Sequence, residues 1–192
     1  DGLVESVQKL FTEAIAEGEA VMNNENAKKE DVLKASLKLM KAIQALDMKA
    51  GDKADLGMAL ELTDMIDLTK YVEAGQKEYL EAKTEAEHVM ENGDAMQPEV
   101  DTAWETLVET MMNLRLKADK STLSDLLDSV KNLDLDKYTD ETAAVYKEAL
   151  AAAMAVMEDD TLSQDDQTKV DEAVMNLMIA KADLKEKECL RC

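Results

Sequence analysis

Residues 98–133 decide the fold, and they read PEVDTAWETLVETMMNLRLKADKSTLSDLLDSVKNL. The stretch has no glycine, and its one proline is Pro98. A proline at this position suits the first turn of a helix. Apolar residues recur at spacings of four and three, as one helix face requires: Val100, Trp104, Leu107, Met111, Leu114 and Ala118. After a five-residue step a second apolar run begins at Leu123. We therefore predict one continuous helix over 98–133 that contributes to two cores, one on each side of 117–122.

An internal repeat surrounds this stretch. Adding 67 to positions between Leu56 and Tyr79 returns matching residues between Leu123 and Tyr146. The offset becomes 70 in the last helix, because three extra residues lie near 165–169, and an offset of 68 relates the first copy to the middle one. These offsets predict four segments: a partial repeat over 1–50 without its first helix, complete three-helix repeats over 51–118 and 119–188, and a tail over 189–192.

Each predicted helix carries a single apolar stripe, which a lone helix cannot bury. Three antiparallel helices joined by short connectors can bury it. The predicted fold class is therefore all-α: tandem three-helix bundles joined by shared long helices into a rod, in a spectrin-like arrangement. Gly51 and Gly57 weaken the other inter-repeat junction, where either a continuous helix or a break is compatible with the sequence.

The composition excludes several classes of function. The 192 residues carry 22 basic and 43 acidic side chains, a net charge of −21. Such a chain repels phosphate backbones and anionic lipid, so we expect neither a nucleic-acid nor a membrane partner. Cys189 and Cys192 form a Cys-x-x-Cys pair, but a zinc site needs two further ligands and a redox motif needs a βαβ context. We interpret them as a tail without a role in the fold.

The sequence offers no catalytic constellation. His88 is the only histidine, and we expect it to be exposed. Nucleophilic triads and zinc sites therefore lack parts. The acidic pairs at 159–160 and 165–166 are read as solvated loop residues in preference to a weak Ca²⁺ site, since the spacing of an EF-hand loop is missing. We expect no enzyme activity, no catalytic, cofactor-binding or metal-binding residues, and no cofactor.

Few aromatic residues are available to bind a ligand. Trp104 lies on the apolar stripe and is predicted to be a core residue, the alternative being an exposed stacking platform for sugars. Tyr71 and Tyr138 occupy equivalent connectors and are predicted to close the ends of their bundles. These two tyrosines are also the weak candidates for ligand binding. The methionines are read as adaptable filling of the cores.

Two stretches carry a resemblance to a known family. One runs Tyr138-Thr139-x-x-Thr142, then Tyr146, Leu150 and Ala153, and continues at Val170-Asp171-x-Ala173-x-x-x-Leu177; the other is Gln97-Pro98-Glu99-Val100-Asp101-x-Ala103-x-x-x-Leu107. Both resemble the FIVAR module, whose name stands for "found in various architectures". The family often has a tryptophan near the start of the second helix, where this chain has Gln76 and Ala143. A role of that tryptophan does not transfer.

The resemblance implies a secreted or cell-surface location in a Gram-positive bacterium, within a large glycan-degrading enzyme or an adhesin. Three functions are then compatible with the residues. A non-catalytic spacer, monomeric and part of a larger chain, is favoured because the repeats supply reach without a defined site. A protein-docking module is the alternative, since a helical face and a charge of −21 suit a basic partner. A carbohydrate-binding module ranks third. The partner would accordingly be another protein or a glycan.

Overall fold

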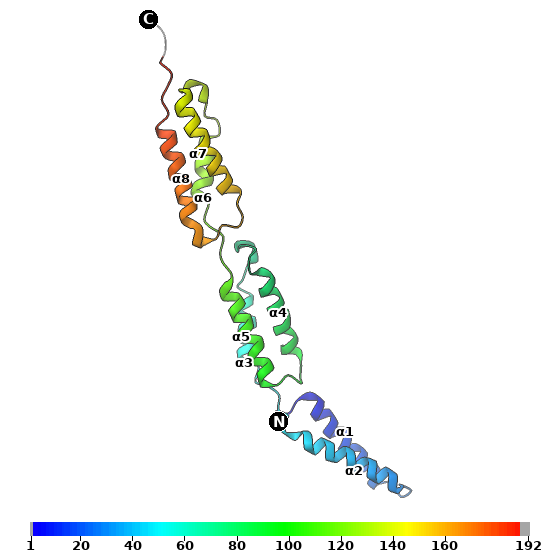
Figure 1. Cartoon of the computed structure of the whole chain (residues 1–192). Coiled ribbons are helices and arrows are strands. Elements are labelled where there is room, and N and C mark those ends of the chain that lie inside the picture. Colours follow the sequence, from blue (N-terminus) through cyan, green and yellow to red (C-terminus); the bar gives the residue numbers. More distant parts are fainter. Residues whose placement is uncertain (1, 189–192) are drawn as a thin grey trace. The chain divides into compact units, whose positions relative to one another are not determined.

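The computed structural model describes residues 2–188, which contain eight α-helices and isolated backbone bridges (Figure 1). The predicted all-α class is confirmed. The helices are α1 (Glu5–Met22), α2 (Lys29–Gln44), α3 (Ala54–Thr63), α4 (Gln76–Glu91), α5 (Gln97–Asn113), α6 (Ser121–Val130), α7 (Asp140–Glu158) and α8 (Gln167–Ala182). The three predicted repeats thus comprise α1–α2, α3–α5 and α6–α8. Cys189 and Cys192 lie outside the described residues.

The helices fall into two compact units, and each is described by itself. The first unit contains residues up to Ile66 together with Lys77–Asn113. In it α1 packs along α2, and α3 packs along α5. Helices α3, α4 and α5 each contribute fully or almost fully buried side chains: Leu56, Ala59, Tyr79, Ala86, Val100 and Leu107. Within each helix these positions are three or seven residues apart, which places them on one helix face.

The second unit contains Asp67–Gln76 and the chain from Leu114 onward. Its helices α6, α7 and α8 surround one core, in which α7 and α8 run along each other (Figure 1). The buried members of this core are Ala118, Leu123, Val130, Tyr146, Ala153, Leu162, Val170, Leu177 and Ala180. Burying these side chains is the main favourable term in the stability of the bundle.

The predicted continuous helix over 98–133 is wrong, and so are the shared helices derived from it. Helix α5 ends at Asn113, residues 114–120 are not helical, and α6 begins at Ser121. Leu114 and Ala118 are buried as the stripe predicts, but from an extended backbone. Asp119 stabilises the start of α6. Its Oδ1 accepts hydrogen bonds from the Ser121 amide at 2.9 Å and from the Ser121 hydroxyl at 2.7 Å.

The junction at Gly51 is also broken, since residues 48–53 lie between the short 3₁₀ turn at Ala45–Asp47 and α3. Gly51 allows a close approach here. A Cβ added at this position would lie 2.7 Å from Val100 Cγ2 and 3.0 Å from the backbone nitrogen of Gln97. The glycine is therefore a requirement of packing, and it does not simply weaken a helix.

Two local predictions are confirmed. Pro98 is in the first turn of α5, where its missing N–H costs no helical hydrogen bond. Ser163 and Asp166 form a capping box at the start of the 3₁₀ turn before α8. The three extra residues of the third repeat are explained by the 3₁₀ turn Gln164–Asp166, which directly precedes α8. None of the helices within residues 2–188 has the length and apolar character needed to cross a bilayer.

Candidate functional site: the linker clamps

The linker 114–120 is bonded to the connector that precedes α4. The Val72 amide donates to the Arg115 carbonyl at 2.9 Å, and the Lys117 amide donates to the Lys70 carbonyl at 2.9 Å. The intervening pair, Tyr71 and Leu116, forms an antiparallel bridge. The backbone groups along one edge of the linker are thereby hydrogen-bonded as in a two-stranded antiparallel sheet.

The opposite edge of the same linker is bonded to the segment before α8. The Ala118 amide donates to the Leu162 carbonyl at 3.0 Å, and the Gln164 amide donates to the Leu116 carbonyl at 2.8 Å. Lys117 and Ser163 form the antiparallel bridge on this side. The linker is therefore the middle one of three extended segments, and these pairings account for the backbone hydrogen bonds that a helix would otherwise have supplied.

A glutamine side chain fixes the end of this linker. The Asp119 amide donates to Gln167 Oε1 at 2.8 Å, and Gln167 Nε2 donates to the Asp119 carbonyl at 2.8 Å. Gln167 Nε2 also donates to Asp171 Oδ1 at 3.1 Å, one helical turn further along α8. The carboxamide thus pairs with both polar groups of one peptide residue, as a neighbouring strand would.

A lysine holds the next position. Lys120 Nζ donates to the carbonyls of Met157 at 3.0 Å and Asp159 at 2.7 Å, at the C-terminal end of α7. The last carbonyls of a helix lack partners within the helix, and the negative end of its dipole attracts a cation. Lys120 therefore caps α7 from the start of α6. We call the glutamine and lysine contacts together a linker clamp.

The same clamp occurs a second time, in the first unit at linker 48–53. The Asp52 amide donates to Gln97 Oε1 at 2.8 Å, and Gln97 Nε2 returns a bond of 3.4 Å to the Asp52 carbonyl. Lys53 Nζ donates to the carbonyls of Met90 at 2.8 Å and Asn92 at 2.6 Å. Two linkers that join successive repeats therefore use the same residue types for the same contacts.

The clamps were not predicted from the sequence, although it contains a signal of them. Asp52-Lys53 recurs as Asp119-Lys120 at the offset of 67, and Gln97 recurs as Gln167 at the offset of 70. Apolar residues that recur at equivalent positions indicate a repeated core. Polar residues that recur at equivalent positions indicate repeated polar contacts in the same way.

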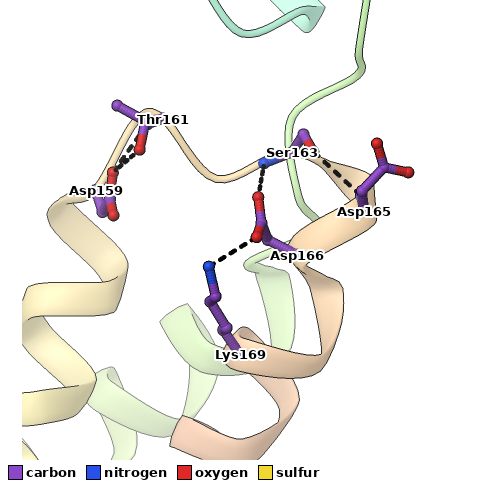
Figure 2. Close-up of polar contacts among 6 residues, drawn as sticks. All are labelled: Asp159, Thr161, Ser163, Asp165, Asp166 and Lys169. Atoms are coloured by element: carbon purple, nitrogen blue, oxygen red, sulfur yellow. Dashed lines mark hydrogen bonds and ion pairs between the residues drawn. The ribbon is translucent and has the colours of Figure 1, made fainter.

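The acidic loop before α8 is engaged in local structure (Figure 2). Asp159 Oδ1 accepts from the Thr161 amide at 3.0 Å and hydroxyl at 2.6 Å, and this hydroxyl is the main cause of the lowered pKa of Asp159. Asp166 accepts from Lys169 Nζ at 2.8 Å, which chiefly lowers the pKa of Asp166, and from the Ser163 amide at 3.3 Å. Within residues 2–188 no three histidine, cysteine, aspartate or glutamate side chains are grouped to hold a metal ion.

Trp104 is partly buried, so it is neither a fully buried core residue nor the exposed platform that was the alternative. Its side chain is half-buried on α5, beside the buried positions Val100, Ala103 and Leu107. The indole Nε1 donates to Asp101 Oδ1 at 3.4 Å. The apolar stripe of α5 is therefore narrower than the sequence suggested, and a polar partner holds the tryptophan at its margin. His88 is exposed, as expected.

The two candidate tyrosines differ in their surroundings. Tyr71 is half-buried and lines a hollow of about 450 Å³ in the second unit, together with Glu73, Lys117 and Asp160. Tyr138 is also half-buried, and its backbone forms an antiparallel bridge with Glu186. The remaining tyrosines, Tyr79 and Tyr146, are almost fully buried core residues. A ligand at the Tyr71 hollow would meet charged groups of both signs beside an aromatic ring.

Comparison with known proteins gives one relative and one family. The chain is similar to a polysaccharide lyase 8 family protein, HylA, of Enterococcus faecalis, with 28% identity over 180 residues. The match covers 90% of this chain and 13% of the length of that protein. No solved structure matches the chain.

The family model described as the FIVAR domain matches residues 5–47, 61–115 and 119–185. These ranges include most of the chain and every one of α1, α2, α4, α5, α6, α7 and α8 in whole or in large part. The resemblance noted in the sequence is confirmed: the chain belongs to the FIVAR domain family.

Proposed function

We propose that this chain is a non-catalytic spacer within a larger secreted or cell-surface protein that acts on glycans. The single observation that carries the proposal is the recurrence of the linker clamp. Gln97 and Gln167 fix the backbone of their linkers in the same way, and Lys53 and Lys120 cap the C-terminal ends of α4 and α7 in the same way. A linker that is specifically bonded holds one conformation, which a flexible tether does not.

The relative supports the larger context. A polysaccharide lyase family protein of which this chain matches 13% has ample room for a catalytic region elsewhere. The acidic surface, with a net charge of −21, favours solubility and weakens non-specific association. Both features suit a segment that positions another domain. A spacer adds no chemistry of its own, in agreement with the expectation that this chain is not an enzyme.

Deletion tests this proposal in the longer protein. Removal of residues 2–188 should leave turnover of a soluble glycan unchanged and reduce turnover of the same glycan immobilised on a bead or cell wall. A matched control replaces the segment with a flexible Gly/Ser linker of equal residue count, which restores length without fixed orientation. Loss of turnover on the soluble glycan after deletion would contradict a spacer role and indicate a catalytic or folding contribution.

A second candidate function is sugar binding at the Tyr71 hollow. The aromatic ring, the Lys117 ammonium, and the carboxylates of Glu73 and Asp160 are the kinds of groups that bind hydroxyl-rich ligands by stacking and hydrogen bonding. A glycan array with the purified chain tests it. Saturable binding that Tyr71→Ala abolishes and Tyr138→Ala preserves would establish a site at this hollow. Absence of binding to every glycan leaves the spacer as the better account.

Protein docking is the remaining alternative for the partner. A basic partner attracted by the net charge of −21 would be retained in a pull-down at low salt and released as the salt concentration rises.

A further inference from the structure

Helices α1 and α2 expose apolar side chains whose counterparts in the other repeats are buried. Val32 on α2 is 48% exposed, whereas its counterparts Val100 and Val170 are 0% and 1% exposed. Phe11 on α1 and Leu39 on α2 are only half-buried. Their counterparts are almost completely buried: Tyr79 and Tyr146 for the first, Leu107 and Leu177 for the second. The first repeat therefore has the residues of a three-helix core but covers them incompletely.

The other two repeats show what covers these positions. In the third repeat, α6 packs against both α7 and α8 and places Leu123 and Val130 in the core. Leu126 and Leu127 of the same helix pack on that core from its edge. In the second repeat α3 packs along α5 and buries Leu56. The covering element is in each case a helix of ten residues at the start of the repeat.

The segment before α1 has the same backbone contacts as the connectors that follow α3 and α6. In the complete repeats a 3₁₀ turn follows the opening helix, and the next residue, Tyr71 or Tyr138, forms an antiparallel bridge with Leu116 or Glu186. Leu3 occupies the corresponding position and bridges Lys49. The Val4 amide donates to the Met48 carbonyl at 3.2 Å, as the Val72 amide does to the carbonyl of Arg115.

We propose that the exposed apolar face of α1 and α2 is an acceptor surface for a short amphipathic helix of the same polypeptide, delivered through Gly2–Val4. The occupant is an opening helix built like α3 or α6, with leucine at the position of Leu56 and Leu123. It covers Phe11, Val32 and Leu39 and completes a third core. Apolar burial drives its docking, since each covered side chain leaves water.

The test grafts an opening helix onto the 192-residue chain in register. The sequence 119–135 is fused ahead of Asp1, so that the graft ends where Leu135 ends before Asp136 in the third repeat. Hydrogen–deuterium exchange of α1 and α2 should slow by about ten-fold or more, while exchange of α7 and α8 stays unchanged. The matched control graft carries aspartate in place of the leucines at 123 and 127, and should leave α1 and α2 unprotected.

Two results would overturn the proposal. One is exchange in α1 and α2 that is already as slow as in α7 and α8 without the graft, or that both grafts slow equally. The other is a concentration-dependent dimer of the ungrafted chain, seen by light scattering, that protects α1 and α2. That dimer would assign the surface to a second copy of the chain instead of a preceding helix.

Discussion

The side-chain amide of Gln167 pairs with both backbone groups of Asp119, through two hydrogen bonds of 2.8 Å each. Gln97 makes the corresponding pair with Asp52 in the other unit. A carboxamide carries an N–H donor and an oxygen acceptor side by side, so it can donate to a carbonyl and accept from an amide of the same residue. The contact therefore depends on the backbone of the linker, and few other side chains could replace the glutamine.

Replacement of Gln167 by alanine should destabilise the chain by about 1–2 kcal/mol, since two net-favourable hydrogen bonds are lost at about 0.5–1.5 kcal/mol each. Urea unfolding followed by circular dichroism measures the change. Gln164→Ala is the matched control, because the Gln164 contact to the linker is made by its backbone amide, which the substitution keeps. An equal effect of both substitutions would remove the special role assigned to the Gln167 carboxamide.

Lys120→Met should loosen the C-terminal end of α7. The substitution keeps an apolar stem and removes the ammonium that donates to Met157 and Asp159. Loss of a lysine at a helix C-terminus costs about 0.3–1 kcal/mol for the dipole contribution, in addition to the bonds. Amide exchange by NMR should accelerate in the last turn of α7. Lys147→Met, on the exposed side of α7, is the control and should leave that turn unaffected.

Gly51→Ala and Gly18→Ala should change stability in opposite directions. At Gly51 a Cβ would come within 2.7 Å of Val100 Cγ2 and 3.0 Å of backbone atoms, so the linker must shift and the first unit is destabilised by about 1–3 kcal/mol. Gly18 lies inside α1, and beyond the backbone of that helix no atom lies within 4 Å of the added Cβ, so alanine should stabilise by about 0.5–1 kcal/mol. Thermal unfolding of the two variants checks both signs, and a stabilising Gly51→Ala would refute the packing described here.

The free energy of unfolding should fall at acid pH, and protonation of Asp159 should account for part of the loss. The Thr161 hydroxyl lowers the pKa of Asp159 in the folded state, so the folded chain binds this proton less readily than the unfolded chain. The resulting stabilisation is present above the unfolded pKa of about 3.9 and is lost as the pH falls through the lower folded value. Asn92 holds the equivalent turn in the second repeat, so Asp159→Asn keeps the turn and removes the charge.

Urea unfolding between pH 7 and pH 2 measures this contribution. The free energies of unfolding of the original chain and the Asp159→Asn variant should differ near neutral pH and converge as the pH falls below about 4. Glu158→Gln removes one negative charge from the adjacent residue and serves as the control for general charge repulsion. A difference that stays constant across the pH range would show that the Asp159 carboxylate contributes nothing through its ionisation.

Most of the fold could be predicted from the sequence because it depends on local periodicity. Val100, Leu107 and Leu177 were placed on apolar stripes, and all three are fully buried. The break at 114–120 could not be found in this way. Leu114 and Ala118 keep the helical spacing by coincidence, since both are buried by an extended linker whose hydrogen bonds go to segments far away in the sequence.

The candidate site was predicted much less well. Tyr71 and Tyr138 are aromatic residues in equivalent connectors, and their repetition at an offset of 67 is the signal that marks them as candidates. Gln97 and Lys120 look like ordinary polar surface residues, and their roles depend on the backbone carbonyls and amides of other segments. A sequence does not display such backbone partners, so the polar side chains that contact them are recognised only through repetition or a structure.

A distance distribution between the two repeats of the first unit tests most directly whether a clamp makes its linker stiff. Spin labels are attached to Glu30→Cys on α2 and Glu87→Cys on α4, both exposed and both in the first unit, after Cys189 and Cys192 are changed to serine. Pulsed electron paramagnetic resonance should give a single narrow distribution that broadens in the Gln97→Ala, Lys53→Met double variant. A broad distribution in the unmodified background, unchanged in the double variant, would contradict the account.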